Sequence, residues 1–442
     1  MSTRPAAAHT AASEAHAASR PRSTRDMIAV NLGNALEWYD WNIYTIFAPV
    51  FAAQIFRSED PTSALLATLA VFAVGFVARP VGGYLFGAYA DRVGRKRSLF
   101  AAMLITALGS LMIAATPTFE VAGVFASVML VVARLLQGLA HGGEMGTAVT
   151  YLVERAPASR RALFGSTSWV SVVVGTMLAT VTGLLINGLL TPEQVEDWGW
   201  RVAFGAGGLL GLYALYLRRF ISESEQFTAA QQVVPETSAP ARRTGMGALA
   251  EHWRGLLIIF AVSAGGSLMF YTWLIYLPTH AQLAHGMSPT TTLTASLIAQ
   301  SIFLVAILGA GLLGDRLGRR PLVIAFGVAF MALPFPLFGM MDGSFASFLA
   351  AQLIALLAVA LLFGVNGAVW SEVLSVTVRA KGVATMLSLA TAIFGGTAPY
   401  VITWLSSHDM MPVFLVYLVV IGAVTGLTGL LMRETKGVDL AR

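Results

Sequence analysis

Five ionisable side chains lie inside stretches that are otherwise apolar, and all of them belong to the first half of the chain. They are Glu37, Asp40, Arg79, Arg134 and Glu144. A charge inside a lipid bilayer is costly unless it is paired, so each is a functional candidate by default. Three acids face two arginines, and two pairs would leave one carboxylate able to take up a proton. The chemistry that these residue types suggest is proton transfer and the binding of an anion.

The spacing of these residues predicts which of them share a helix face. Glu37 and Asp40 are three residues apart, about 60° around a helix axis, with Asn34 and Tyr44 on nearby faces. One face of a later predicted helix carries Arg134, Gln137, His141 and Glu144. We expect Asp40 or Glu144 to take up a proton, with Glu37 and His141 as further candidates for the coupling site.

The same residues supply candidates for anion binding. Arg79 or Arg134 is expected to meet an anionic group, with Gln137, Asn34 and Tyr44 nearby. The second half has no clear charge at the membrane midplane, and there Tyr271 and Asn366 are deep enough to line a cavity. The structural alternative is that the buried acid–arginine pairs only hold helices together.

The composition indicates the kind of structure that holds these residues in place. Hydrophobic residues make up 56% of the chain and charged residues 12%, against about 25% charged in soluble domains. Apolar runs of membrane-spanning length alternate with short polar connectors. The predicted spans are 27–52, 64–90, 98–116, 121–153, 162–189, 199–218, 255–283, 289–314, 321–341, 345–374, 380–406 and 411–432. The expected fold is therefore an all-α membrane protein of twelve transmembrane helices.

The remaining segments divide this chain into domains. Residues 1–26 are predicted to be a disordered cytoplasmic tail, since they lack the apolar stretch of a signal peptide. Two bundles of six helices, 27–218 and 255–432, are joined by a cytoplasmic linker at 219–254 and followed by a tail at 433–442. Cysteine is absent, which excludes disulfides and thiolate chemistry.

The basic residues indicate the orientation. With both termini in the cytoplasm, every Lys and Arg except Arg57, Arg79, Arg134 and Arg201 falls on the cytoplasmic side. This asymmetry accounts for the net charge of +5 without nucleic acid as a partner. The expected partners are the lipid bilayer, protons and a small molecule.

Two signatures occur once in each half, which indicates related halves. Gly87–Lys96 and Gly311–Arg320 share the pattern Asp-Arg-x-Gly-Arg followed by Lys or Arg, and each of two glutamates has an arginine seven residues later. These residues are predicted to form a cytoplasmic gate, an ionic latch that breaks when that side opens. The predicted gate comprises Asp91, Arg92, Arg95, Glu154, Arg161, Asp315, Arg316, Arg319, Glu372 and Arg379.

The repeated loops resemble those of the major facilitator superfamily, and further motifs resemble its metabolite:H⁺ symporter family. These motifs are Gly33–Asp40, Arg79–Gly83, Arg134–Glu144, Trp198–Arg201, Tyr276–Thr279 and Phe394–Pro399. The resemblance covers nearly the whole chain from residue 27. It implies alternating access and proton-driven uptake of an organic acid, or of a zwitterion such as proline or betaine.

The leading prediction is a proton symporter of a small organic anion in the bacterial inner membrane, functional as a monomer. A proton-driven exporter and a membrane sensor without transport are the other candidates. An enzyme is disfavoured, because the sequence shows no metal cluster, phosphate loop or nucleophile triad. No cofactor is expected.

Overall fold

A computed structural model describes residues 24–58, 60–93, 95–142, 145–218, 251–376 and 378–440. Within these ranges the secondary structure is entirely helical, in agreement with the predicted all-α class. Most of the predicted N-terminal tail, most of the predicted linker, and Glu144 lie outside the described residues.

The first half contains long helices joined by short connections. Its elements are α2 (Thr24–Ile55), α3 (Pro61–Val93), α4 (Arg95–Ala114), α5 (Phe119–Ala122), α6 (Val124–His141), α7 (Met145–Arg155), η1 (Ala158–Arg160), α8 (Arg161–Leu189), α9 (Pro192–Gln194), η2 (Val195–Gly199) and α10 (Trp200–Arg218). The predicted span 121–153 corresponds to α6 and α7 together.

The second half contains more interrupted helices. Its elements are α13 (Trp253–Phe270), η3 (Tyr271–Tyr276), α14 (Leu277–His285), α15 (Pro289–Leu317), α16 (Arg320–Ala332), α17 (Pro334–Gly339), α18 (Phe345–Phe363), α19 (Asn366–Glu372), α20 (Arg379–Ala390), η4 (Thr391–Gly395), α21 (Ala398–Ser407) and α22 (Met411–Leu431). The interruptions η3 and η4 are π-helical turns, which occur frequently at functional sites.

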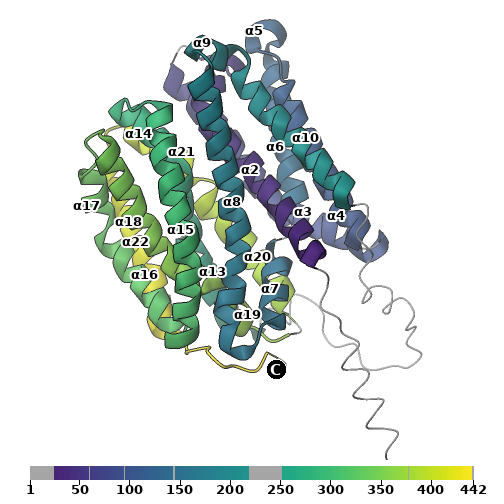
Figure 1. Cartoon of the computed structure of the whole chain (residues 1–442), viewed down its shortest axis with the longest axis vertical. Helices are drawn as coiled ribbons and strands as arrows, with labels where there is room; N and C mark the ends of the chain where they lie inside the picture. The colour runs from purple at the N-terminus through teal and green to yellow at the C-terminus, as the bar shows by residue number, and fades with distance from the viewer. Residues whose placement is uncertain are drawn as a thin grey trace, which may run out of the picture.

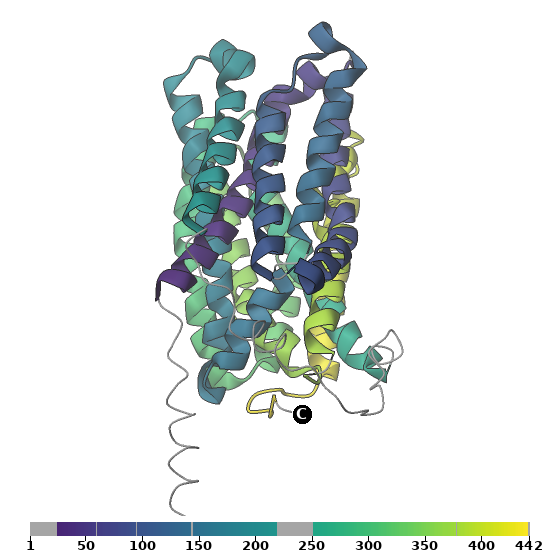
Figure 2. The ribbon, with the colours of Figure 1, turned by 90° about the vertical axis from the view of Figure 1, so that its right-hand side faces the viewer.

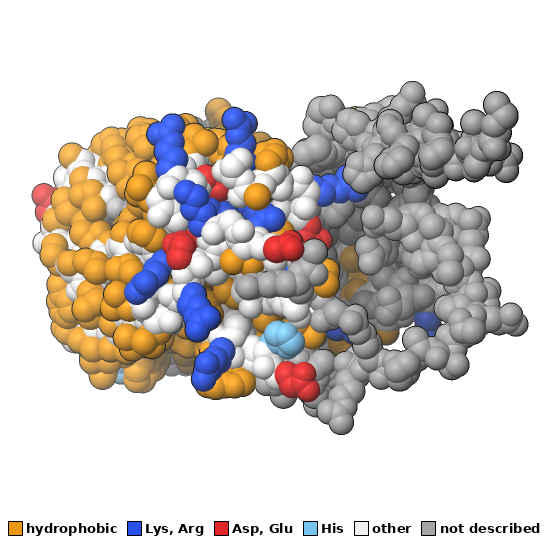
Figure 3. Space-filling view, turned by 90° about the horizontal axis from the view of Figure 1, so that it is seen from below, with side chains coloured by type: hydrophobic (Ala, Val, Ile, Leu, Met, Phe, Trp, Pro, Cys, Tyr) orange, Lys and Arg blue, Asp and Glu red, His pale blue; other side chains and the backbone are white. Residues whose placement is uncertain are grey.

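The long helices lie roughly along one direction, and the two halves lie side by side (Figures 1 and 2). Helices α8 and α15 form an extensive contact between the halves, and α2 packs against α8 and α10 within the first half. Lys and Arg side chains gather on the lower face of the molecule, within an apolar rim (Figure 3). We call this face, where α7 and α15 end and α8 begins, the basic end.

Much of the outer surface is apolar, as expected for a protein surrounded by lipid. Leu189 and Leu431, for example, are more than three-quarters exposed. Eight helical segments among the described residues are long and apolar enough to cross a membrane: Pro61–Phe86, Val124–His141, Ala158–Leu189, Trp253–His285, Pro289–Leu317, Phe345–Glu372, Arg379–Ser407 and Met411–Leu431. Helix α2 is not among them, and it carries Glu37 and Asp40 in its middle.

Glycines allow α3 and α6 to approach each other at backbone distance. A Cβ added to Gly138 would lie 2.0 Å from the carbonyl oxygen of Gly75, and one added to Gly142 would lie 1.8 Å from that of Arg79. These distances are shorter than real Cβ contacts, so only glycine fits without separating the helices. The crossing places Arg79 on α3 beside the face of α6 that carries Arg134.

Replacing Gly138 by alanine is expected to destabilise the protein by about 1–3 kcal/mol or more, because the added methyl group overpacks a backbone contact. Thermal unfolding of the purified variant should show a lower midpoint than wild type. The matched control is Gly205→Ala on α10, where a Cβ meets nothing within 4 Å and better helix propensity should leave stability unchanged or higher. Equal midpoints for both variants would contradict the close crossing.

Candidate functional site

The two acids of α2 are buried, and they contact different partners. Glu37 is 6% exposed and Asp40 is 2% exposed. Asp40 is bonded to residues of α4 and α6, whereas Glu37 is paired with the last residue of α6. The difference follows from their angular offset on the helix. The acids therefore belong to two separate polar contacts.

Three side chains surround the carboxylate of Asp40. The Ser110 hydroxyl donates to Oδ1, and Gln137 Nε2 donates to Oδ2 at 2.5 Å. Arg134 Nη1 lies 4.0 Å from the same Oδ2, and the Arg134 side chain is fully buried. The arginine and the two donors favour the ionised carboxylate, whereas removal from water favours the protonated one. A carboxylate held between these opposing effects can change protonation when a neighbour moves.

Arg134 is also held by an aromatic ring. Its guanidinium carbon lies 3.8 Å from the ring centroid of Tyr44, a cation–π contact. The Tyr44 hydroxyl in turn donates to the carbonyl oxygen of Thr68 at 2.8 Å. Tyr44 thus positions Arg134 next to Asp40.

Glu37 pairs with His141 at the end of α6. Glu37 Oε2 lies 2.8 Å from His141 Nδ1. The rings of Trp38 and Trp41 lie about 6 Å from the His141 ring, at 6.1 and 6.0 Å between centroids. This pair therefore lies in an aromatic environment beside the first site.

Arg79 is buried but has no acid in contact among the described residues. Its guanidinium carbon lies 4.2 Å from the ring centroid of Trp41 and 3.9 Å from that of Phe76. Nε and Nη2, which form one edge of the guanidinium, have no hydrogen-bond partner within the described part of the chain. The neighbouring Tyr271, whose ring lies 5.2 Å from that of Phe76, places its buried hydroxyl next to Arg79. This edge can accept a carboxylate in a bidentate geometry.

The other predicted binding residues make contacts between helices. Asn34 Nδ2 donates to the Ser171 hydroxyl at 2.6 Å. Asn366 Oδ1 accepts a hydrogen bond of 2.9 Å from Trp169 Nε1, which links the two halves. The structure thus brings Arg79 and Tyr271 together, and it groups Arg134 and Gln137 with Asp40.

Sequence reasoning did not identify Ser110 or Trp38 as site residues. Ser110 is one of two serines in α4, and nothing in its local sequence marks it. Trp38 stands between the two acids, and its buried indole Nε1 has no hydrogen-bond partner among the residues that the structure describes. The position of Trp38 within the Gly33–Asp40 motif is a feature of the sequence that could have identified it.

A small crevice reaches the two acids from the side away from the second half. Its volume is about 20 Å³, which is enough for one water molecule. Its lining comes from α2, α4 and α10 and includes Glu37, Asp40, Thr106, Ser110 and Gly207. A water molecule there could contact both carboxylates without passing Arg79.

The two halves contact each other on both sides of this cluster. Away from the basic end, the hydroxyl of Thr279 on α14 donates to the Thr45 carbonyl oxygen on α2 at 3.4 Å. At the basic end, Asp315 on α15 accepts hydrogen bonds from the backbone N–H groups of Ala162 and Leu163 at 2.9 and 3.0 Å. These two donors begin α8, where a negative charge is favourable.

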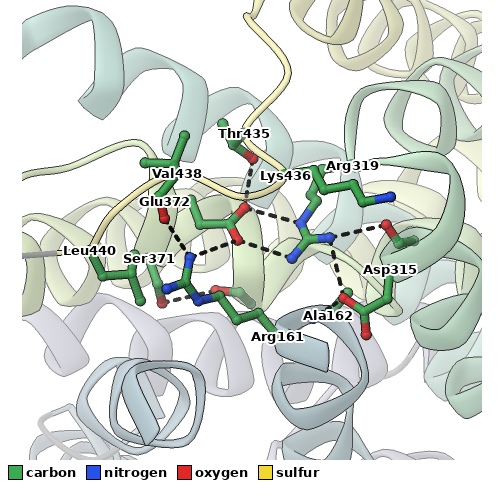
Figure 4. A network of polar contacts seen from close by, with 12 residues as sticks. Arg161, Ala162, Asp315, Arg319, Ser371, Glu372, Thr435, Lys436, Val438 and Leu440 are labelled. Carbon is green, nitrogen blue, oxygen red and sulfur yellow. Dashed lines mark hydrogen bonds and ion pairs between the residues drawn. The ribbon is translucent and has the colours of Figure 1, made fainter. Parts of the chain in front are cut away.

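Glu372 is the centre of a charged network at the basic end (Figure 4). Arg319 donates to both of its carboxylate oxygens at 3.0 Å, and the Thr435 hydroxyl donates to Oε2 at 2.7 Å. Arg161 from the first half lies 3.9 Å away. Arg379 pairs with Glu154, also across the halves, at 2.8 Å. The glutamate and arginine that are seven residues apart in sequence therefore contact the opposite half rather than each other.

The C-terminal residues cover this network. The carbonyl oxygen of Val438 accepts from Arg161 at 2.5 Å, and that of Leu440 accepts from Arg379 at 2.8 Å. The carboxylate of Glu434 accepts hydrogen bonds from backbone N–H groups at the start of α16 and from those of the two residues that follow it in the chain. Partial burial acts to raise the pKa of Glu434, but these hydrogen bonds hold it below the ordinary value.

The first copy of the repeated loop makes fewer described contacts at the basic end than the second copy. The side chains of Asp91 and Arg95 lie outside the described residues, although their helices are described. Arg92 is exposed. Arg316 contributes its carbonyl oxygen, which accepts from Lys436 Nζ at 2.7 Å.

Replacing Asp315 by asparagine is expected to weaken closure at the basic end. Hydrogen bonds to charged groups contribute about 1.5–3 kcal/mol, so loss of one should shift the equilibrium toward opening about tenfold. Because the chain lacks cysteine, a single Ser166→Cys reporter, buried at the α8–α15 contact, can be labelled selectively with a maleimide. Labelling should accelerate in the Asp315→Asn background and stay unchanged with the exposed control Asp409→Asn. An unchanged rate in both would contradict the closing role of Asp315.

Comparisons with known proteins show which family this chain resembles. The family model for "Sugar (and other) transporter" matches residues 27–246 and 246–442. The alpha-ketoglutarate permease of Escherichia coli K12 is 33% identical over 417 residues, covering 94% of this chain and 95% of the permease. The citrate-proton symporter of Klebsiella pneumoniae is 32% identical over 387 residues, covering 86% of this chain and 85% of the symporter.

A solved structure shows the same fold. It is that of a proton:xylose symporter of the major facilitator superfamily, with a TM-score of 0.74, 18% identity, and coverage of 94% of this chain and 96% of that chain. Together with the family match, this likeness confirms the resemblance predicted from the motifs. The chain therefore belongs to the sugar (and other) transporter family of the major facilitator superfamily, as a relative of its metabolite:proton symporters.

Proposed function

We propose that this chain takes up a small organic anion together with protons across the bacterial inner membrane by alternating access. The observation that carries this proposal is the separation of two buried sites. Arg79 offers a guanidinium edge that no described residue bonds, while Asp40 forms its own contact with Arg134. One site suits an anion and the other a proton, and the protein is a transporter and not an enzyme.

The anion site consists of Arg79 and Tyr271, from opposite halves. A ligand between them would contact both halves at once, as alternating access requires. Arg134 and Gln137 support the proton site through Asp40, and Asn34, Tyr44 and Asn366 position the helices that carry the two sites. An organic acid fits the names of the relatives, one a permease for alpha-ketoglutarate and one a symporter for citrate.

Asp40 is the proposed proton carrier. Its carboxylate has the arginine Arg134 within 4.0 Å, and the crevice gives it access to water apart from Arg79. Glu37 lines the same crevice and pairs with His141, so these two are proposed as the next members of the proton path. Glu144 remains a candidate from the sequence alone.

The proposed topology has twelve spans in two six-helix bundles, 27–218 and 255–432, with both termini in the cytoplasm. The gathering of Lys and Arg at the basic end supports this orientation. The network around Glu372 is then the cytoplasmic gate, in which Asp315, Arg319, Arg161, Glu154 and Arg379 join the halves. The Asp91 loop is proposed to act at the same face. The functional unit is proposed to be a monomer.

Uptake by purified protein in proteoliposomes tests this function. An imposed gradient, alkaline inside, should drive accumulation of radiolabelled carboxylates above the level in protein-free liposomes. An acidic interior should prevent it. Accumulation only with an acidic interior would indicate an exporter, and accumulation of betaine alone would indicate a zwitterion carrier.

A further inference from the structure

The residues that follow α22 run along the basic end and reach from the second half to the first. Figure 1 shows this C-terminal segment passing below the lower end of α8. Thr435 and Leu440 are buried within it, at 5% and 9% exposed. The segment continues a helix of the second half, yet Val438 accepts a hydrogen bond from Arg161 of the first half. It therefore lies across the boundary between the halves.

The first part of the segment is fixed to the second half. The Thr435 hydroxyl donates to Glu372 Oε2 at 2.7 Å, and Lys436 Nζ donates to the carbonyl oxygen of Arg316 at 2.7 Å. Both partners belong to the same half as the segment itself. These contacts can therefore persist when the two halves separate at this end.

The contact with Arg161 does cross the boundary. Arg161 lies 3.9 Å from Glu372, which is too far for a hydrogen bond. Its Nη1 donates instead to the carbonyl oxygen of Val438 at 2.5 Å (Figure 4). A hydrogen bond from an ionised donor is about twice as strong as one between neutral groups. This bond must break if α8 moves away from the second half.

A second carbonyl group of the segment holds the other arginine of the network. Arg379 Nη2 donates to the carbonyl oxygen of Leu440, and Arg379 Nη1 donates to Glu154 of the first half, both at 2.8 Å. The planar guanidinium fixes the directions of its donors relative to one another. Leu440 therefore helps to orient Arg379 toward Glu154.

A tight turn directs these carbonyl groups toward the arginines. The backbone N–H of Val438 donates to the carbonyl oxygen of Thr435 at 3.1 Å. Gly437 stands between them with φ +82°, the value for the third residue of a type II turn, which glycine adopts without strain. A Cβ at Gly437 would meet nothing within 4 Å. An alanine there would thus disturb the backbone alone.

From these contacts we propose that Gly437–Leu440 is a strap that holds the basic end closed, and that Val438 releases Arg161 each time this end opens. The proposal rests on the proposed alternating access and goes beyond it, because it assigns part of the closure to main-chain carbonyl groups. Loss of the strap shifts the protein toward the state that is open at the basic end.

Gly437→Ala tests the strap without removing any bonded side chain. An L-residue is disfavoured at this φ, so the turn should open and withdraw both carbonyl groups. Maleimide labelling of the buried Ser166→Cys reporter should then accelerate at least about tenfold, because hydrogen bonds to charged groups are lost. The matched control is Gly343→Ala, with φ +86°, beside His285 at the end of α14 away from the basic end. It should leave labelling unchanged.

A shortened chain and a side-chain variant complete the set. Ending the chain after Lys436 removes the strap but keeps the contacts of Thr435 and Lys436. This chain should label at least as fast as Gly437→Ala. Val438→Ala keeps the bonded carbonyl group and should label at the wild-type rate. Size-exclusion profiles should show each variant folded.

Asp315→Asn provides the reference for opening at this end. Faster labelling with Asp315→Asn but wild-type rates with Gly437→Ala and the shortened chain would overturn the strap and leave alternating access intact. Wild-type rates in all three would overturn both. Equal acceleration by Gly437→Ala and Gly343→Ala would indicate general loosening of the fold and would also overturn the strap.

Discussion

Replacing Arg79 by alanine is expected to reduce transport by about 10²–10³-fold. Among the described residues, Arg79 has no acid in contact and its Nε and Nη2 lack a hydrogen-bond partner. Leaving a bound carboxylate buried without its partner costs about 3–5 kcal/mol. Arg79→Lys should recover only part of this loss, because an ammonium keeps the charge but cannot present two parallel N–H groups. Initial rates of uptake in proteoliposomes measure both effects.

The matched control for Arg79 is Arg201, which lies at the start of α10 and donates to the Thr116 carbonyl oxygen at 3.0 Å. Arg201→Lys should transport at nearly the wild-type rate. Size-exclusion profiles should show all three variants folded. Transport by a folded Arg79→Ala variant within a factor of about three of wild type would remove Arg79 from the anion site.

Replacing Asp40 by asparagine is expected to abolish accumulation driven by a pH gradient while exchange of substrate across the membrane continues. An amide cannot carry the proton, but the anion site at Arg79 remains. Asymmetric loading of labelled and unlabelled substrate measures exchange, and an imposed pH gradient measures accumulation. Glu37→Gln is the comparison variant in both assays, because Glu37 lines the same crevice as Asp40 but lacks the contact with Arg134.

The single substitution leaves Arg134 as a buried charge without its acid, which can cost about 3–5 kcal/mol of stability. The double variant Asp40→Asn with Arg134→Gln restores the charge balance and keeps the experiment interpretable if the single variant is unstable. It too should exchange without accumulating. Persistent accumulation by either variant would show that another group carries the proton, with Glu37 and Glu144 as the next candidates.

The elements and the important charges could be predicted from the sequence because their signals are local. Apolar runs identify helices, and a charge inside such a run, as with Asp40 or Arg79, is conspicuous whatever surrounds it. The fold followed from motifs in a fixed order. The break of the tenth predicted span between α18 and α19 is less visible, because Gly364 and Val365 lie within an apolar run.

The partners of these residues could not be predicted, because they depend on how distant helices cross. The sequence alone allowed either Arg79 or Arg134 to bind the anion. Only the contact of Arg134 with Asp40 distinguishes the roles of the two arginines. Ser110 joins Asp40 from a helix 70 residues away, with nothing in its surroundings to mark it. The seven-residue spacing of Glu154 and Arg161 predicted an ionic latch without saying which residues pair, and the crossing of the halves brings Arg379 to Glu154.

The most direct test of proton symport is a pH electrode in a weakly buffered suspension of proteoliposomes. The suspension starts without gradients, and the acid that accumulates best is added outside. Coupled uptake predicts that the external medium becomes alkaline as protons enter with the anion, and that the Asp40→Asn variant gives no such signal. Acidification of the medium, or uptake of labelled substrate without any pH change in wild type, would contradict the account.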